Sequence, residues 1–342
     1  MLIHRQKYIF AALLLLFSLL VGCGDSSTLP ASPDTPLDSV QTDSNVTGET
    51  APDIAENLTP YSFVWMSDTQ LYSQGKPKTY MKIVNWIVDN MEEYNMQYVF
   101  HTGDVVHRRK EAEQWVNADN AMKVLDGVIP YSVLAGNHDV GWKGAEYETY
   151  LEYFSKDRFQ GSENRREYYK DGQATAEWLT VGNTKFVILA LGYHLPNNAI
   201  YTWANEILAE SRDCIAILTT HEYLHVDATH TDAGERLFKN VVKKNPNVHM
   251  VLCGHNHYSN RAIQPIDDDG DGKTDRNVIE MIADYQTVGN GGDGYIRIIT
   301  IRESTRTLEV KTYSPLLNKY NCYEDTPDQD TFTLSIADWF ND

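Results

Sequence analysis

Short apolar runs alternate with longer segments of helical period over much of the chain after residue 60. The runs predict buried strands at 61–66, 98–100, 131–134, 184–191, 214–218 and 248–252. Apolar residues spaced three or four positions apart predict helices at 77–94, 111–125, 201–210 and 234–244. This strand–helix rhythm predicts an α/β fold in which parallel strands are joined by right-handed crossovers.

The pattern changes in the last third of the chain, where the helical period disappears. Strands are predicted at 261–264, 277–282, 295–301, 307–313 and 331–336, separated by turns rich in Gly or Asp. We therefore expect the second half of the core to be antiparallel. Residues 142–177 show no clear period and are expected to cover the rim of a site.

The first 60 residues do not follow either pattern. Residues 1–22 have a basic start and then an apolar run that is too short for a membrane span, which predicts an export signal. The sequence Leu20-Val21-Gly22-Cys23 resembles the lipobox of bacterial lipoproteins, which implies an exported chain whose lipid at Cys23 anchors it to a membrane. An ordinary signal peptide that carries a cysteine is the alternative. Residues 23–60 are rich in Ser, Thr, Pro and acids, which predicts a disordered tether, and residues 61–342 form the expected domain.

Charge and cysteine content narrow the candidate functions. The chain of 342 residues is 42% hydrophobic, enough for a large core, and carries a net charge of −19. The expected domain holds 41 acidic and 27 basic residues, a net charge of −14, so a nucleic-acid polymer is not an expected partner. Cys214, Cys253 and Cys322 include no Cys-x-x-Cys pair; free thiols are favoured, and a disulfide stays open.

Polar side chains follow five of the predicted strands where a purely structural strand has no need of them. They are Asp68 and Gln70, Asp104, Asn137 and His138, His221, and His255 and His257. The carboxyl ends of neighbouring parallel strands share one edge of a sheet, so these residues are expected to converge. Carboxylate, amide oxygen and imidazole together suit divalent manganese, iron or zinc. Eight candidate groups exceed one tetrahedral site and favour two metals.

The ordered series resembles the motif set of the calcineurin-like metallophosphoesterases. It consists of Asp68-x-Gln70, Gly103-Asp104, Gly136-Asn137-His138-Asp139, His221 and Gly254-His255-Asn256-His257. The resemblance covers about 61–257. It implies a four-layer α/β/β/α sandwich with mixed sheets and a dinuclear hydrolase that acts on a phosphomonoester or phosphodiester.

The resemblance also implies a role for each residue. Asp68, Gln70, Asp104 and His257 would hold one metal, and Asp104 would bridge to a second one held by Asn137, His221 and His255. His138 would protonate the leaving oxygen or stabilise the phosphoryl charge, with Asp139 orienting its ring. Two cations lower the pKa of a shared water, so that hydroxide can attack the phosphorus near neutral pH.

Two positions depart from the usual family pattern. The family most often has His where Gln70 stands, and Asp or Asn where His107 stands. Gln70 offers a neutral oxygen. This implies that the first metal is bound more weakly or that the first site prefers a harder metal ion. His107 is interpreted as an extra ligand, a phosphate contact or a rim residue without a chemical role.

An acidic run after the motifs raises a separate question. Asp267, Asp269 and Asp271 alternate before Gly272 and resemble the start of a calcium loop, but Val278 stands where such a loop has Glu. A solvated hairpin turn and a calcium-stabilised turn are both open.

As a whole, the sequence predicts an exported, lipid-anchored metallophosphoesterase, with a non-catalytic surface binding lipoprotein of the same fold as the alternative.

Overall fold

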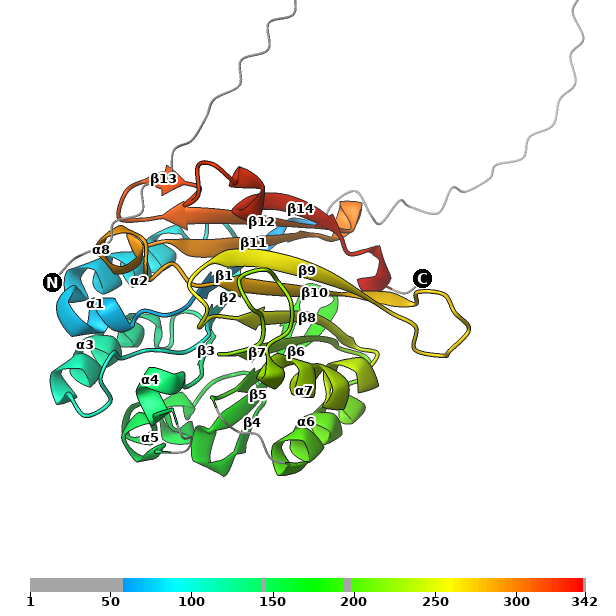
Figure 1. The fold of residues 1–342 in the computed structure, drawn as a ribbon, viewed down its shortest axis with the longest axis horizontal. Coiled ribbons are helices and arrows are strands. Elements are labelled where there is room, and N and C mark those ends of the chain that lie inside the picture. The colour runs from blue at the N-terminus through cyan, green and yellow to red at the C-terminus, as the bar shows by residue number, and fades with distance from the viewer. Residues whose placement is uncertain (1–57, 143–145, 194–197, 341–342) are drawn as a thin grey trace, which may run out of the picture. The chain divides into compact units, whose positions relative to one another are not determined.

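Two seven-stranded sheets lie face to face in the computed structural model, which describes residues 58–142, 146–193 and 198–340 (Figure 1). The first sheet has the order β13-β12-β11-β1-β2-β3, and β14 also pairs with β12. Its strands are β1 (Tyr61–Met66), β2 (Met96–His101), β3 (Tyr131–Val133), β11 (Ile296–Arg302), β12 (Thr307–Ser314), β13 (Lys319–Tyr320) and β14 (Thr331–Ser335). The pairs β1–β2 and β2–β3 are parallel, and β11 joins β1 in the antiparallel sense.

The second sheet has the order β4-β5-β6-β7-β8-β10-β9. Its strands are β4 (Arg166–Tyr169), β5 (Ala174–Val181), β6 (Thr184–Leu191), β7 (Ile215–Thr220), β8 (Val248–Cys253), β9 (Ser259–Ile266) and β10 (Arg276–Ala283). Strands β6, β7, β8 and β10 run parallel to one another, so their carboxyl ends lie at one edge of the sheet.

Helices cover the outer faces of both sheets. They are α1 (Gln70–Gly75), α2 (Pro77–Asn90), α3 (Ala112–Met122), α4 (Asn137–Val140), α5 (Glu148–Phe154), α6 (Asn198–Glu210), α7 (Asp232–Asn240) and α8 (Gly289–Gly292). Short 3₁₀ turns are η2 (Lys123–Leu125), η3 (Lys156–Phe159), η4 (Lys170–Gly172), η5 (Val242–Lys244), η6 (Glu303–Thr305), η7 (Pro327–Gln329) and η8 (Ala337–Trp339).

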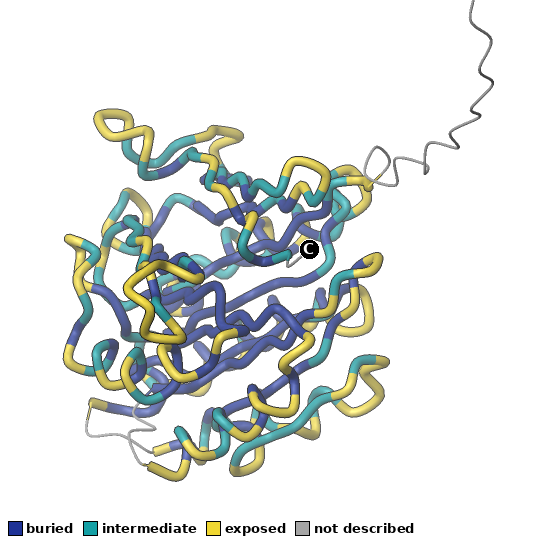
Figure 2. The backbone as a smooth tube through the Cα atoms, turned by 90° about the vertical axis from the view of Figure 1, so that its right-hand side faces the viewer, coloured by how far each residue is buried: buried dark blue, intermediate teal, exposed yellow. Residues whose placement is uncertain are grey.

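Strand β1 shows why the apolar runs are continuous. Phe63 and Trp65 pack into the core between the two sheets, whereas Val64 and Met66 pack against the helices outside the first sheet. Because successive side chains point to opposite faces, a strand covered on both sides is apolar at every position. Figure 2 shows such strands as continuous buried stretches, with exposed residues concentrated in the loops.

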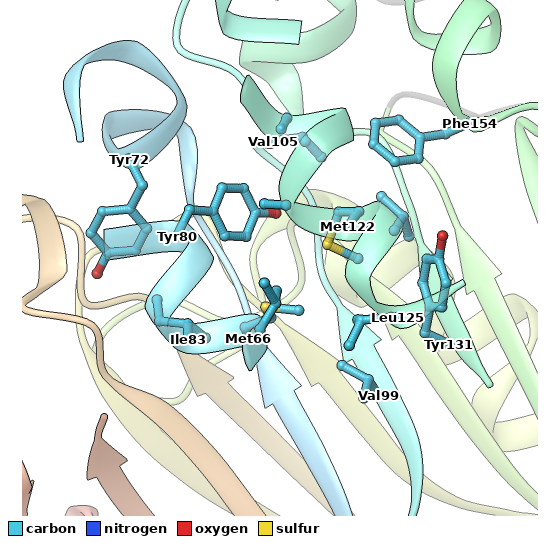
Figure 3. Close-up of a cluster of buried hydrophobic side chains, with 14 of the residues drawn as sticks. Met66, Tyr72, Tyr80, Ile83, Val99, Val105, Met122, Leu125, Tyr131 and Phe154 are labelled. Atoms are coloured by element: carbon cyan, nitrogen blue, oxygen red, sulfur yellow. The ribbon is translucent and has the colours of Figure 1, made fainter. Parts of the chain in front are cut away.

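The outer core of the first sheet is built mainly on α1, α2 and α3. Tyr80 and Ile83 of α2 lie in it beside Tyr72 of α1 and Met122 of α3 (Figure 3). A separate cluster joins α6 and α7 to the outer face of the second sheet. The order helix, sheet, sheet, helix confirms the expected α/β/β/α sandwich.

Several elements differ from the sequence-based expectation. Strand β10 pairs with β8 in the parallel sense, so the second half of the core is not wholly antiparallel. The stretch expected to be irregular contains α5, β4 and the first half of β5, because Arg166–Tyr169 forms a partly exposed edge strand without an apolar pattern. The helix expected over 234–244 is α7 followed, after a break, by η5.

The expectations for the export signal, Cys23 and most of the tether fall on residues 1–57, outside the described residues. Within the described ranges, no helix is long and apolar enough to cross a membrane. Cys214, Cys253 and Cys322 are free thiols, the first two buried, which agrees with the favoured interpretation.

Candidate metal centre

The expected site residues follow the carboxyl ends of strands in both sheets. Asp68 follows β1, Asp104 follows β2 and Asn137 opens the turn after β3; His221 follows β7, and His255 and His257 follow β8. Backbone bonds hold these turns together, from Asp68 N–H to the Gly103 carbonyl at 3.0 Å and from Gly254 N–H to the His221 carbonyl at 3.0 Å. The two sheets therefore share one site at this edge.

Four of the expected ligands converge closely. Asn137 Oδ1 lies 3.0 Å from His221 Nε2 and 2.9 Å from His255 Nδ1, and His221 Nε2 lies 3.4 Å from Asp104 Oδ1. Asp104, Asn137 and His221 are almost fully buried. This group matches the set expected for the second metal.

The other expected ligands are Asp68, Gln70 and His257. Gln70 Nε2 is 3.2 Å from Asp104 Oδ2, so the two oxygens of Asp104 face different groups. Asp68, Asp104 and His221 can each place a ligand atom within 4.8 Å of the others. His257 lies outermost, with half of its side chain exposed and its Nε2 atom 3.8 Å from Asp284 Oδ2.

Electrostatics in the site favour a cation. Burial and the Asp284 carboxylate raise the pKa of Asp68 well above its usual value. Although burial opposes it, the Asp104 carboxylate raises the pKa of His221 to about 10. Burial and the charge on His221 lower the pKa of His255 to about 4, which keeps that ring neutral with a lone pair for a metal. A divalent cation among these carboxylates would relieve their mutual repulsion.

The donors present fit divalent metals of the expected kind. Gln70 Oε1 is buried and has no hydrogen-bond partner among the described residues. This amide oxygen can therefore bind a cation without breaking a hydrogen bond. Carboxylate, amide and imidazole ligands without thiolate suit manganese, iron or zinc.

Backbone strain gathers at the same residues. Asp68, Asp104 and His255 adopt left-handed conformations, with φ of 53°, 54° and 72°. Such conformations cost of order 1–3 kcal/mol each and are concentrated at functional sites. Here they turn the ligand side chains inward directly after the strand ends.

Two glycines allow the turns to approach one another. A Cβ atom at Gly136 would overlap the Asp104 carboxylate, and one at Gly254 would overlap the Asp68 carboxylate. Gly136 has an extended backbone, with φ of −98°, so close approach and not a special turn conformation explains the glycine.

His138 lies at the open side of the centre. Its Nδ1 atom is 2.8 Å from the His107 carbonyl oxygen, which places the proton of a neutral ring on Nδ1, and its Nε2 atom is 3.9 Å from Asp104 Oδ2. The His107 ring stacks on the His138 ring, with centroids 4.9 Å apart. His107 thus fixes the ring of His138.

Asp139 has a different environment from the one expected. Its carboxylate accepts the backbone N–H groups of Val105 at 3.1 Å, Val106 at 2.9 Å and Gly136 at 2.8 Å. The expectation that Asp139 orients the His138 ring is corrected, because these bonds instead tie the turn after β3 to the turn after β2.

Aromatic side chains border the centre. Trp142 is 65% exposed, and its ring centroid lies 5.9 Å from that of His255 and 6.5 Å from that of His138. Tyr193 packs against His221 and His255 from the buried side. The open side of the site therefore carries an exposed indole.

Sequence analysis missed Asp284 and Gln286. Asp284 is fully buried, and Gln286 Oε1 accepts a hydrogen bond from Gln70 Nε2 at 2.6 Å. Polar residues after the run 277–282 are the available signal, but the sequence predicts that this run belongs to an antiparallel part of the core, whose strand ends have no fixed relation to the site.

The acidic turn lies between β9 and β10, at the end of β10 opposite Asp284. The structure brings Asp267, Asp269 and Asp275 together, and not the expected Asp271, whose carboxylate lies 2.9 Å from Lys273 Nζ. Asp267 accepts the backbone N–H groups of Gly270 and Gly272. These hydrogen bonds account for the shape of the turn, and the hairpin and calcium-stabilised alternatives both stay predictions.

Comparison with known proteins identifies the family. The sequence model for calcineurin-like phosphoesterases matches residues 61–259. The protein YvnB of Bacillus subtilis (strain 168) is 43% identical over 279 residues, which cover 81% of this chain but 22% of YvnB, so the chain spans about a fifth of that relative. The purple acid phosphatase PPD1 from yellow lupin (Lupinus luteus) seeds has a similar fold, with a TM-score of 0.55 at 14% identity over 82% of this chain and 54% of that one. The chain belongs to the calcineurin-like phosphoesterase family.

Proposed function

We infer that this protein hydrolyses a phosphomonoester or phosphodiester with two divalent cations at the edge shared by the two sheets. The observation that carries this inference is the position of Asp104. Its Oδ1 atom faces His221 at 3.4 Å and its Oδ2 atom faces Gln70 at 3.2 Å, so one buried carboxylate serves two groups of ligands. Family membership independently supports metal-dependent hydrolysis of phosphate esters.

Each group of ligands fits one cation. Asp68, Gln70 and His257 would hold the first with Asp104, and Asn137, His221 and His255 would hold the second with Asp104. When bound, two such cations would provide an activated water and charge neutralisation for the phosphoryl group. The protein holds the ligands rigidly, because most are buried and several are bonded to one another.

His138 is placed to act on the leaving group. With Nδ1 held by the His107 carbonyl, Nε2 faces the centre and, in the protonated ring, can give its proton to the departing oxygen. Its side chain is 27% exposed, so a substrate can reach it. A positive ring also stabilises charge on the phosphoryl oxygens.

Aryl phosphates are the first substrates to test, because the exposed Trp142 ring lies beside His138 and can stack on a planar leaving group. The full-length protein is loaded in turn with manganese, iron and zinc and assayed on aryl phosphate monoesters, aryl phosphate diesters, nucleotides and phospholipids. We expect hydrolysis of at least one class. Bound metal without hydrolysis of any class would contradict the proposal and favour the alternative of a non-catalytic surface binding lipoprotein.

We also infer that Cys23 carries a lipid that anchors the protein to the membrane of a bacterium, on the basis of the sequence around it. The native protein should incorporate labelled palmitate and partition with membranes. A Cys23→Ser protein should do neither, and equal labelling of both would contradict the anchor.

A further inference from the structure

Asp284 is a buried carboxylate that accepts hydrogen bonds from Gln286. It is fully buried, and among the described residues its one ionisable partner within 4.0 Å is His257, whose Nε2 atom lies 3.8 Å from Asp284 Oδ2. Neither Lys nor Arg pairs with it in the described part of the chain. Burying an unpaired carboxylate is costly, so its position at the metal centre calls for a reason.

The strand pairing explains how Asp284 reaches the centre. Ile282 of β10 pairs with Cys253 of β8 in the parallel sense, which sets Asp284 level with His255. The backbone N–H of Asp284 bonds to the Tyr258 carbonyl at 2.9 Å, which fixes the end of β10 to the loop after His257. Strand β10 therefore contributes a sixth strand end to the site.

Gln286 connects Asp284 to Gln70. Asp284 accepts the backbone N–H of Gln286 at 2.9 Å and its side-chain Nε2 at 3.2 Å. Because Gln286 Nε2 is used in this way, its Oε1 atom accepts from Gln70 Nε2 at 2.6 Å. The Gln70 amide is then fixed with its nitrogen between Gln286 and Asp104 and its Oε1 atom buried and unbonded.

We propose that Asp284 and Gln286 are positioning residues for the first metal, acting through its ligands Gln70 and His257. Gln286 fixes the Gln70 amide, whose nitrogen donates to Gln286 Oε1 and Asp104 Oδ2, and this leaves the buried Oε1 atom free of other bonds for a cation. Asp284 Oδ2 lies 3.8 Å from Nε2 of the half-exposed His257 and orients that ring electrostatically, as carboxylates commonly do for metal-bound histidines. The pair also adds negative charge where Gln70 supplies none.

This arrangement accounts for the departure at position 70. A neutral amide binds a divalent cation less strongly than an imidazole fixed by a carboxylate, and its amide can present either end to the metal. The hydrogen bonds from Gln286 remove that freedom, and the nearby Asp284 carboxylate raises the electrostatic affinity of the site. This inference rests on the proposed metal centre but not on any particular substrate.

Titration of the metal-free, full-length protein with manganese, followed by calorimetry, tests the proposal. The wild type should bind two equivalents. Asp284→Asn and Gln286→Ala should each weaken one of the two binding steps by about 10–100-fold and leave the other unchanged, because groups that orient metal ligands typically contribute that much. Cobalt in the weakened site should show a changed visible absorption spectrum.

Glu280→Gln is the matched control. Glu280 is also a fully buried carboxylate on β10, but it is bonded to Tyr223 and His230 and takes no part in the site. Its variant should keep both binding steps. Superposable titrations of wild type, Asp284→Asn and Gln286→Ala would overturn the proposal, as would equal weakening of both steps. Two metals bound by a wild type that hydrolyses no phosphate ester would refute the proposed function while leaving this one intact.

Discussion

His138 is the site residue whose role can be separated most cleanly from metal binding. Its imidazole is positioned by the His107 carbonyl and lies 3.9 Å from Asp104, whereas the groups expected to hold metals lie behind it. A side chain that gives a proton to the leaving group should affect turnover alone.

His138→Ala should therefore keep the metal content of the wild type while kcat for an aryl phosphate falls about 10²–10⁴-fold, the usual contribution of a general acid. Elemental analysis and steady-state kinetics on the same preparation measure both quantities. His107→Ala, which keeps the carbonyl but removes the stacked ring, serves as the control and should lose less. Loss of metal from His138→Ala would show that His138 is a ligand.

The backbone of His255 adopts a left-handed conformation, whose energetic cost can be measured. Glycine adopts φ near 72° without the steric cost that a Cβ atom brings, so His255→Gly should unfold at higher denaturant than His255→Ala. We expect a difference of about 0.5–1 kcal/mol in the metal-free protein, where neither variant has an imidazole.

Asn137 provides the contrast for that comparison, because it begins α4 with helical geometry. There the Gly variant should be the less stable of the pair. An Ala variant at 255 as stable as the Gly variant would mean that the strain inferred at His255 is absent.

At the scale of elements, the strands were predictable where both faces are covered. The runs that became β1, β6, β7 and β8 are apolar at nearly every position because helices and the opposite sheet bury both sides. Strand β4 is only partly buried at every residue, and its sequence, two charged residues followed by two tyrosines, has no apolar pattern that predicts a strand. The pattern of apolar residues along a strand reflects how far its two faces are buried. An edge strand is buried less and therefore has a weaker pattern.

Helix α2 illustrates the same relation. Ile83, Val84 and Ile87 are buried as their spacing predicts, whereas Val88 and Met91 are only partly buried because the helix turns them toward its margin. Their contributions to stability should differ accordingly.

Ile87→Ala should lower the free energy of unfolding by about 2–5 kcal/mol, the cost of a cavity in a packed core, without altering the manganese titration. Val88→Ala should cost distinctly less. Urea unfolding monitored by circular dichroism measures both variants. A loss at Val88 equal to that at Ile87 would contradict the packing described for α2.

The site residues were predictable where each one directly follows the end of a predicted strand. Asp68, Gln70, Asp104, Asn137, His221 and His255 converge as expected, because the order of motifs indicates which strands are parallel. The roles of Asp139 and Asp284 could not be read in this way. Both roles depend on which loops are neighbours in the folded sandwich. That arrangement is set by tertiary packing and is not visible in the local sequence.

At the scale of the whole molecule, stability should depend on pH through buried neutral histidines. His249 of β8 lies far from the metal centre beside Trp339, and burial lowers its pKa to about 4. An unfolded chain takes up this proton near pH 6.5. The folded protein should thus have the full contribution of His249 above about pH 6.5 and lose it as the pH falls toward 4.

His249→Gln removes this titration, so its stability relative to the wild type should rise by up to about 3 kcal/mol between pH 7 and pH 4. Urea unfolding of both proteins across this range measures the change. A constant difference between the two would show that His249 titrates normally in the folded state.

The proposed function depends on Asp104 as a ligand of both cations. The most direct measurement follows the hydrolysis of an aryl phosphate while manganese is added in known equivalents to the metal-free, full-length protein, with Asp104→Asn in parallel. We predict that wild-type activity saturates at two equivalents and that Asp104→Asn stays inactive throughout. Saturation at one equivalent, or an Asp104→Asn protein as active as the wild type, would contradict the shared carboxylate on which the proposed function rests.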